Sequence, residues 1–339
     1  MSQIVLVSLW EQDEIAAYVL DPRDGELRPA ARTAVSGRPA PLALDAPARV
    51  LHVGRRGTPC LASYRVDPTT GALDQIGEAA LPSDPCCLAL DATRRWLFSA
   101  YYNAGALAVH RVDDSGAVSG EPVQWLRTAT GAHMLATERT NRFAFAPHIS
   151  REDGWNTIAQ YRFDAATGAL TPRDPPRADP PGPLGPRHFC LHPRLDRLYT
   201  SNEQGCSVTV WSLDAESGTL TPVQTVSTLP PGFHGASKCA QIRITPCGRF
   251  LYAPNRGHDT IACMRVDPRD GRLTVIGHAP ADAVPRVIEV TPSGRFLLAG
   301  GLETATLQTY RIDPATGLLR RVARVQVGDG PMWILAAAL

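Results

Sequence analysis

The segment "AAYVLDPRDGEL" at residues 16–27 returns near the end of the chain as "QTYRIDPATGLL" at residues 308–319. Each copy has a strand-like apolar run, then an aspartate, a short turn that ends in glycine, and a new apolar residue. Aspartate starts such turns because its side chain accepts backbone hydrogen bonds, and glycine tolerates the positive φ that the turn requires. Each copy therefore predicts a β-hairpin.

Seven copies of this pattern run through the chain of 339 residues. The spacing between successive turn aspartates ranges from 46 residues (Asp21 to Asp67) to 53 residues (Asp214 to Asp267), which is typical of a repeated supersecondary unit. The seven aspartates are Asp21, Asp67, Asp113, Asp164, Asp214, Asp267 and Asp313.

Two further strand-like runs precede most of the hairpins. "RFLYAPN" at 249–255 is one example of the first kind, and "CAQIRITP" at 239–246 is one example of the second. Four strands per unit, repeated seven times without helical periodicity, predict an all-β fold, a seven-bladed β-propeller of four-stranded antiparallel blades. The signatures of WD40 repeats are absent. We expect residues 1–339 to form one domain, with the Pro-rich stretch 171–186 as an extended connection between blades.

The two ends of the chain supply the strands that one blade lacks. "IVLVSLW" at 4–10 matches a second strand without a first, and "GPMWILAAAL" at 330–339 matches a first strand with nothing after it. We therefore predict that residues 331–337 pair beside residues 3–10 and close the ring, which removes its open edges.

Composition excludes several classes of function. The formal net charge is +1 and basic residues form no run, which argues against a nucleic-acid or membrane partner. The eight cysteines show no CxxC pair and no zinc-like spacing, so we expect reduced thiols, no metal and no other cofactor. The N-terminal residues lack the features of a signal peptide, and no run reaches transmembrane length, so we expect a cytoplasmic protein.

The repeat indicates where a site would lie. The innermost strands of a propeller line its central channel, and their first residues share one face of the disc with the loops between second and third strands. The residues at the start of the inner strands are Ala40, Cys86, His133, Arg187, Ala240, Arg286 and Met332. The loops on the same face add Glu203, Arg256, Asp259, His148 and Asp153.

Arginines that share one cavity repel one another unless an anion is bound between them. The guanidinium group also presents a planar, bidentate set of donors that suits a carboxylate or a phosphate. The pattern therefore predicts a small anion site at one mouth of the channel, formed by Arg187, Arg256 and Arg286.

Several segments resemble those of the seven-bladed lactonase family, whose members include bacterial 6-phosphogluconolactonase and carboxy-cis,cis-muconate cyclase. They are "RHFCLHPRLDRLYTSNE" at 187–203, "ITPCGRFLYAPNRG" at 244–257, "VPRVIEVTPSGRFLLAGG" at 284–301 and "VGDGPMWILA" at 327–336. The resemblance covers essentially the whole chain and is strongest toward the phosphogluconolactonases. It implies a metal-independent conversion between a lactone and its open acid, with a polar cluster at His133, Arg187, Glu203 and Arg256.

We expect His133 and Glu203 to be the catalytic pair, one as the base and the other as an acid or an orienting partner, in an order that the sequence leaves open. Arg187, Arg256 and Arg286 would bind the substrate, a small anionic lactone. The first expectation for that substrate is 6-phosphogluconolactone.

Several alternatives stay open. The loop 146–157 and "AGGLETA" at 299–305 depart from the family's pattern beside the site, so the substrate could be another sugar-acid lactone or a carboxymuconate-type lactone. The fold would equally permit a noncatalytic binding platform. Residue by residue, Glu203 and Arg256 could be ordinary loop residues, His133 could cap a strand, and Arg187 or Arg286 could belong to a structural ion pair.

Overall fold

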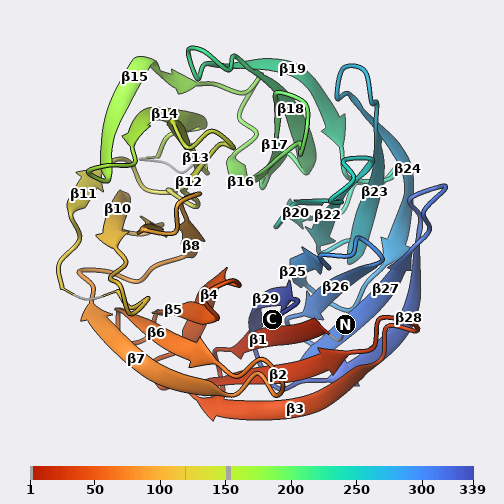
Figure 1. The fold of residues 1–339 in the computed structure, drawn as a ribbon. Helices are drawn as coiled ribbons and strands as arrows, with labels where there is room; N and C mark the ends of the chain where they lie inside the picture. The colour runs from red at the N-terminus through yellow and green to blue at the C-terminus, as the bar shows by residue number, and fades with distance from the viewer. Residues whose placement is uncertain (1–2, 119, 150–153) are drawn as a thin grey trace.

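The computed structural model describes residues 3–118, 120–149 and 154–339. Within these ranges the chain forms β-strands and no helices, arranged as seven sheets around a central axis (Figure 1). The strands of each sheet pair antiparallel, so the predicted seven-bladed propeller is confirmed.

The first four blades follow one another along the chain. Blade 1 comprises β4 (Pro39–Asp45), β5 (Val50–Arg55), β6 (Cys60–Val66) and β7 (Leu73–Ala80). Blade 2 comprises β8 (Cys87–Leu90), β9 (Trp96–Tyr101), β10 (Ala106–Arg111) and β11 (Gln124–Arg127). Blade 3 comprises β12 (Ala136–Thr137), β13 (Phe143–His148), β14 (Thr157–Asp164) and β15 (Ala169–Ala178). Blade 4 comprises β16 (Pro186–Leu191), β17 (Arg197–Asn202), β18 (Ser207–Leu213) and β19 (Leu220–Ser227).

The last three blades complete the ring. In blade 5 the inner strand is split into β20 (Lys238–Cys239) and β21 (Arg243–Ile244), which both pair with β22 (Phe250–Arg256), followed by β23 (Thr260–Val266) and β24 (Leu273–Pro280). Blade 6 comprises β25 (Pro285–Val290), β26 (Phe296–Gly301), β27 (Thr306–Ile312) and β28 (Leu319–Gln326). Blade 7 comprises β29 (Pro331–Ala337), β1 (Gln3–Leu9), β2 (Glu14–Leu20) and β3 (Leu27–Ala34).

Blade 7 joins the two ends of the chain. β29 is its innermost strand and pairs antiparallel with β1, with Ile4 opposite Ala337 and Val7 opposite Ile334. Figure 1 shows the N- and C-terminal ends side by side in this sheet. The predicted closure by residues 331–337 is confirmed, and β1 is buried along its whole length.

The first part of the Pro-rich stretch forms a strand, and only the rest is a connection between blades. Residues up to Ala178 belong to β15, the outermost strand of blade 3, and only the residues after Ala178 cross to β16. Proline is tolerated there because an outermost strand has one edge without a ladder partner.

The repeated hairpins form as the aspartate and glycine pattern predicts. Asp67 Oδ1 accepts the backbone N–H groups of Thr69 at 2.9 Å and Thr70 at 2.7 Å, and Gly71 has a φ of +74°. These hydrogen bonds also lower the pKa of Asp67. The other six aspartates also accept backbone N–H groups two residues ahead, so all seven are turn residues.

Apolar side chains fill the space between neighbouring blades. Phe189 of blade 4 lies edge-on to Phe145 of blade 3, with ring centroids 6.3 Å apart, and Leu198 is completely buried beside them. Trp211 is also completely buried, and its indole N–H donates to Thr200 Oγ1 at 2.9 Å. This packing holds the inner strands in place around the channel.

Three buried histidines stay neutral within the blades. Burial lowers the pKa values of His52, His110 and His148 to about 4, because the interior disfavours the imidazolium form. The ring of His52 hydrogen-bonds Ser63 and that of His110 hydrogen-bonds Ser99, at 3.1 and 2.9 Å.

Because these three histidines are neutral in the folded protein, we expect mild acidification to lower the free energy of unfolding. Between the unfolded histidine pKa of about 6.5 and the folded value of about 4, the unfolded chain binds protons that the native chain does not. The free energy of unfolding should therefore fall as the pH drops from 7.5 to 5.5, with a slope of up to about 1.4 kcal/mol per pH unit for each histidine. Denaturant titrations at both pH values measure this slope. His110→Gln should reduce it, and equal stability of the parent at both pH values would contradict the assignment.

Candidate functional site

Several inner strands begin with an irregular step in the backbone, where their register against the second strand shifts. In blade 4 the register between β16 and β17 shifts between Pro186 and His188, and blade 6 has the same shift between Pro285 and Val287. In a regular strand neighbouring side chains point to opposite faces, whereas a bulge changes the direction of one of them. As a result Arg187 and His188 line the same pocket.

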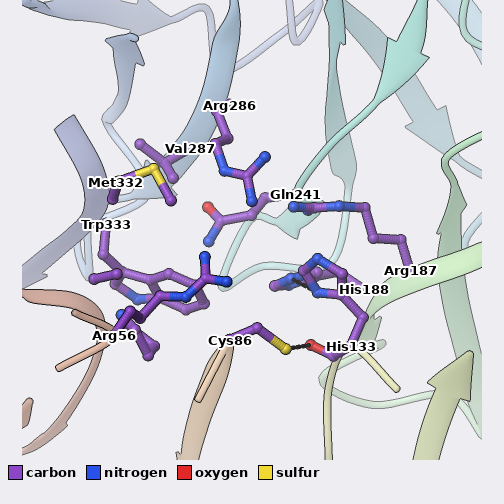
Figure 2. Close-up of a pocket in the computed structure, with 12 residues that line it drawn as sticks. Arg56, Cys86, His133, Arg187, His188, Gln241, Arg286, Val287, Met332 and Trp333 are labelled. Carbon is purple, nitrogen blue, oxygen red and sulfur yellow. Dashed lines mark hydrogen bonds between the residues drawn. The ribbon is translucent and has the colours of Figure 1, made fainter. Parts of the chain in front are cut away.

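Two connected spaces occupy this end of the channel. The outer cavity has a volume of about 260 Å³ and is lined by Arg56, Cys86, Tyr102, Asn103, His133, Glu203, Arg256 and Arg286. The inner pocket has a volume of about 10 Å³, and its lining includes Arg187, His188, Gln241, Met332 and Trp333. Arg56, Cys86, His133 and Arg286 line both spaces. Figure 2 shows the guanidinium groups of Arg56, Arg187 and Arg286 turned toward a common centre.

Glu203 pairs with two of the predicted arginines. Its Oε2 accepts hydrogen bonds from Arg187 Nε at 2.9 Å and from Arg256 Nη2 at 2.8 Å. Backbone hydrogen bonds to Gly185 and Cys239 fix the position of Glu203 between blades 4 and 5. Burial raises the pKa of Glu203, but the attraction of Arg187 and Arg256 outweighs it, so the net pKa is lowered. Glu203 is therefore a carboxylate at neutral pH.

Arg187 is the most buried of the site's charged groups, with 2% of its side chain exposed. Burial, together with the charge of Arg256, lowers the pKa of Arg187 to about 10. Its Nη1 atom is buried and has no hydrogen-bond partner within the described chain. Glu203 therefore accepts a hydrogen bond from Nε of Arg187 but leaves the Nη1 donor of Arg187 unsatisfied.

Arg286 has no carboxylate bonded to it in the described structure, although the negative charge of Glu203 offsets part of its positive charge. Across the described ranges no residue hydrogen-bonds its guanidinium group or forms an ion pair with it. Burial and the charges of Arg187 and Arg256 lower the pKa of Arg286 to about 9. An arginine that is desolvated and repelled in this way is poised to bind an anion.

A fourth arginine, Arg56, joins the cluster and was not among the predicted site residues. It follows β5 directly and hydrogen-bonds Asp84 Oδ2 through Nη2 at 2.7 Å. A signal for it exists in the sequence, since the "RG" of Arg56 and Gly57 occupies the same place in its blade as that of Arg256 and Gly257. The positions that follow the second strand in other blades hold Tyr102 and Glu203, which also line the outer cavity.

The two spaces together carry excess positive charge. The charged side chains are Arg56, Arg187, Arg256 and Arg286, opposed by Glu203 and by Asp84, the partner of Arg56. Four guanidinium groups against two carboxylates leave a formal net charge of +2. A partly desolvated site with this charge favours a small dianion.

His133 stands at the boundary between the two spaces. A left-handed glycine, Gly131 (φ +93°), lets the chain approach Ile149, where a Cβ would collide with the carbonyl oxygen of that residue. The backbone N–H of His133 donates to the carbonyl of Pro147 at 3.0 Å. Its ring Nδ1 lies 3.1 Å from His188 Nε2, a hydrogen-bonding distance.

The imidazole of His133 is neutral. Burial lowers its pKa well below the ordinary value, and the charges of Arg187 and Arg286 and the proximity of His188 lower it further. In the tautomer in which Nδ1 donates to His188, the Nε2 lone pair of His133 is available as a proton acceptor. His133 and Glu203 are thus both in their basic forms at neutral pH, the neutral imidazole and the carboxylate.

Cys86 also lines both spaces, but its thiol is not activated. Burial raises the pKa of Cys86 to about 11, and its Sγ lies within hydrogen-bonding distance of the carbonyl oxygens of Ala100 at 3.3 Å and Ala132 at 3.4 Å. Figure 2 shows its further contact with the carbonyl of His133. A protonated thiol is a weak nucleophile, so Cys86 contributes to the packing of the site.

Some residues from the predicted ring and loops lie elsewhere. His148 is completely buried and hydrogen-bonds Ala146 and Thr128, and Asp259 accepts the backbone N–H groups of Gly257 and Val284, so both have structural roles. Gln241 lines the inner pocket in place of its neighbour Ala240. Asp153 lies outside the described residues.

No group of three or more His, Cys, Asp or Glu side chains in the described part of the chain has an arrangement that could hold a metal ion. No helix of the described structure is both long enough and apolar enough to cross a membrane.

Comparison with known proteins places this site in a family context. The family described as "Lactonase, 7-bladed beta-propeller" matches residues 5–336. The 6-phosphogluconolactonase of Pectobacterium carotovorum is 36% identical over 222 residues, which are 66% of this chain and 65% of that protein. The 6-phosphogluconolactonase of Erwinia tasmaniensis is 31% identical over 216 residues, which are 64% of this chain and 63% of that protein. The chain thus matches just under two thirds of the length of these relatives.

Solved structures share the whole fold. The periplasmic gluconolactonase of Pseudomonas aeruginosa superposes with a TM-score of 0.90 at 26% identity, covering 100% of this chain and 99% of that one. A protein from Lactobacillus plantarum superposes with a TM-score of 0.89 at 21% identity, covering 99% of this chain and 100% of that one, and supports the fold alone.

Proposed function

This chain belongs to the family of seven-bladed β-propeller lactonases, and we propose that it hydrolyses a phosphorylated sugar lactone, 6-phosphogluconolactone, to the open acid. The observation that carries this proposal is the arginine cluster with its net charge of +2, because a phosphate monoester near neutral pH carries a charge between about −1.5 and −2. The names of the 6-phosphogluconolactonase relatives support the same substrate.

The phosphate would occupy the outer cavity. Arg56, Arg256 and Arg286 line that cavity. Arg187 is hydrogen-bonded to Glu203 and lines the inner pocket. We therefore divide the predicted clamp, assigning Arg256 and Arg286, with Arg56, to the phosphate and Arg187 to the reacting end of the lactone. Tyr102 and Asn103 also line the outer cavity, and the sugar hydroxyls would lie beside them.

His133 is the better placed of the two candidate bases, because it lines both spaces while Glu203 lines only the outer one. In the proposed reaction Nε2 of His133 takes a proton from water as the water oxygen bonds to the lactone carbonyl carbon. The carbonyl π pair moves to the carbonyl oxygen and forms the tetrahedral oxyanion. When that pair returns, the bond from carbon to ring oxygen breaks, and the imidazolium of His133 gives its proton to the departing oxygen.

The arginines and Glu203 make this proton transfer feasible. The resting cluster lowers the pKa of His133, whereas a bound phosphate would offset the arginine charges and return the basicity of His133 toward its ordinary value. Glu203 would hold Arg187 beside the developing oxyanion through the hydrogen bond to Arg187 Nε. Substrate binding would thereby activate the base.

We further propose that the reaction needs no metal ion or other cofactor, that the protein acts in the cytoplasm, and that neither nucleic acid nor a membrane is a partner. The second candidate substrate is an unphosphorylated sugar lactone, which the name of the P. aeruginosa gluconolactonase favours, and a carboxymuconate-type lactone is a third. A noncatalytic platform is less well supported. In the described chain the exposed large apolar residues are Val123 and Leu318, which do not form a docking patch at the site.

A pH-stat assay with freshly prepared lactones tests the enzymatic function. Acid release from 6-phosphogluconolactone should exceed the rate in buffer and should persist after exhaustive treatment with a chelator. Acceleration of none of the three lactone types would favour the binding platform, and loss of activity that a divalent ion restores would contradict the metal-free reaction.

Replacing Arg256 or Arg286 with lysine should weaken substrate binding. Lysine keeps the positive charge but loses the planar pair of donors, so KM should rise roughly 10-fold while the melting temperature changes little. Arg187→Lys should instead lower kcat, because we assign Arg187 to the reacting end. Arg320→Lys, at an exposed position of β28, is the matched control. Parental kcat and KM in all three site variants would place the anion elsewhere.

A further inference from the structure

The inner pocket gathers buried hydrogen-bond donors that have no acceptor. Arg187 Nη1, Gln241 Nε2 and Trp333 Nε1 are all buried, have no hydrogen-bond partner among the described residues, and belong to residues that line this one pocket. Leaving one such group unsatisfied costs about 1–3 kcal/mol, so three such groups on residues that line one pocket indicate a function that offsets the cost.

Each of the three groups presents an N–H and not an acceptor. Gln241 Oε1 accepts the backbone N–H of Ile288 at 3.0 Å, which identifies Nε2 as the end of the amide that is left without a partner. The indole of Trp333 can only donate. Arg187 uses Nε to bind Glu203, and Nη1 remains. Figure 2 shows the Gln241 amide between the guanidinium groups of Arg286 and Arg56, with the Arg187 guanidinium to one side of it.

The size and charge of the pocket define what it can hold. Its volume of about 10 Å³ is close to the minimum that accommodates one water-sized group and is too small for a phosphate. Three donors, with the guanidinium groups of Arg56 and Arg286 also in the lining, favour a single oxygen atom that carries negative charge.

We propose that Arg187, Gln241 and Trp333 form an oxyanion hole, the donor pocket, which receives the carbonyl oxygen of the lactone. This inference rests on the proposed function and adds Gln241 and Trp333 to the groups that contact the reacting atoms. As water attacks the carbonyl carbon, the π pair moves onto the oxygen inside the donor pocket, and it returns when the ring bond breaks. With the oxygen placed there, the carbonyl carbon lies at the boundary of the two spaces, beside His133.

Two substitutions remove a donor while preserving shape. Trp333→Phe keeps an aromatic ring but lacks the N–H, and Gln241→Glu can still accept from Ile288 but no longer donates. Each should lower kcat about 10²-fold, with KM and the melting temperature near the parental values. Gln308→Glu is the matched control, because Gln308 Nε2 is also buried without a partner but lies on β27, away from both spaces.

A spectroscopic readout tests the donor pocket independently of turnover. In ¹⁵N-labelled protein, the indole N–H signal of Trp333, identified by its absence in Trp333→Phe, should move downfield when 6-phosphogluconate is added, because a carboxylate oxygen of this product would occupy the pocket. The signal should not respond to equal concentrations of sodium chloride.

The two measurements separate the donor pocket from the proposed function. A protein that opens no lactone but whose Trp333 signal moves would contradict the lactonase and leave the donor pocket as a carboxylate site. An active parent whose Trp333 signal is unmoved, or whose Trp333→Phe and Gln241→Glu variants keep the parental kcat, would contradict the donor pocket and leave the lactonase in place.

Discussion

Replacing His133 with alanine is expected to lower kcat by roughly 10²- to 10⁴-fold, the usual contribution of a general base. The variant keeps the arginines and the donor pocket, so substrate should still bind, but no neutral imidazole would remain at the boundary of the two spaces to take the proton from water. Initial rates with freshly prepared 6-phosphogluconolactone measure the effect. His234→Ala, at an exposed position, is the matched control and should leave kcat unchanged.

The substitution Glu203→Gln tests the other residue of the proposed catalytic pair. The amide oxygen can still accept from Arg187 or Arg256, but the negative charge that holds both guanidinium groups is lost. We expect a similar fall in kcat with the fold retained, through the loss of Arg187 as a well-placed donor. Parental kcat in both variants, with lactonase activity intact, would contradict the catalytic assignment of His133 and Glu203.

Deleting residues 331–339 is expected to destabilise the entire ring. β29 buries Met332, Trp333 and Ile334, and truncation of side chains of this size typically costs about 2–5 kcal/mol each. The loss is comparable with the whole stability of an ordinary domain, about 5–15 kcal/mol. It would also expose the inner edge of β1. We propose that residues 1–339 form a single domain, so all seven blades should be affected together.

Thermal unfolding followed by circular dichroism measures the effect of this deletion. The truncated chain should lack a cooperative transition or melt far below the parent, whereas a shorter deletion of residues 338–339, which lie beyond β29, should melt near the parent. A chain without residues 331–339 that melts at the parental temperature would contradict closure of the ring by β29.

The fold could be predicted because the residues that mark each repeat lie close together in the sequence. Each hairpin carries its own aspartate and glycine, so the number of blades follows from counting turns, and the strand missing at one end of the chain is present at the other. The extent of β15 was less predictable. A run of prolines is compatible with both a connection and an outermost strand, and only the pairing with β14 distinguishes them.

The site was predictable only in part. His133, Arg187, Glu203, Arg256 and Arg286 line the two spaces as the strand alignment placed them. Gln241 and Trp333 were missed because strict strand alternation allows only one of two neighbours to face the channel. The register shift beside Trp333 in blade 7, and the interruption between β20 and β21 where Gln241 lies in blade 5, remove this restriction, and no composition or spacing marks them.

The position of Arg56 beside both spaces was missed for a different reason. Its position just past the end of the second strand of blade 1 matches that of Arg256 at the end of β22 in blade 5, so alignment of the repeats could have identified it. Its pairing with Asp84 depends on how two blades approach one another, which a sequence read one repeat at a time does not reveal. The net charge of the site, which we propose selects the substrate, is therefore a property of the assembled ring.

The central claim, that the arginine cluster selects a phosphorylated lactone, is tested most directly by the ratio of kcat/KM for 6-phosphogluconolactone to that for gluconolactone under identical conditions. Loss of charge-assisted contacts worth about 1.5–3 kcal/mol each predicts a ratio of at least roughly 10 in favour of the phosphorylated substrate. The ratio should fall toward one in the variant Arg286→Gln. A parental ratio of one or less would contradict the account.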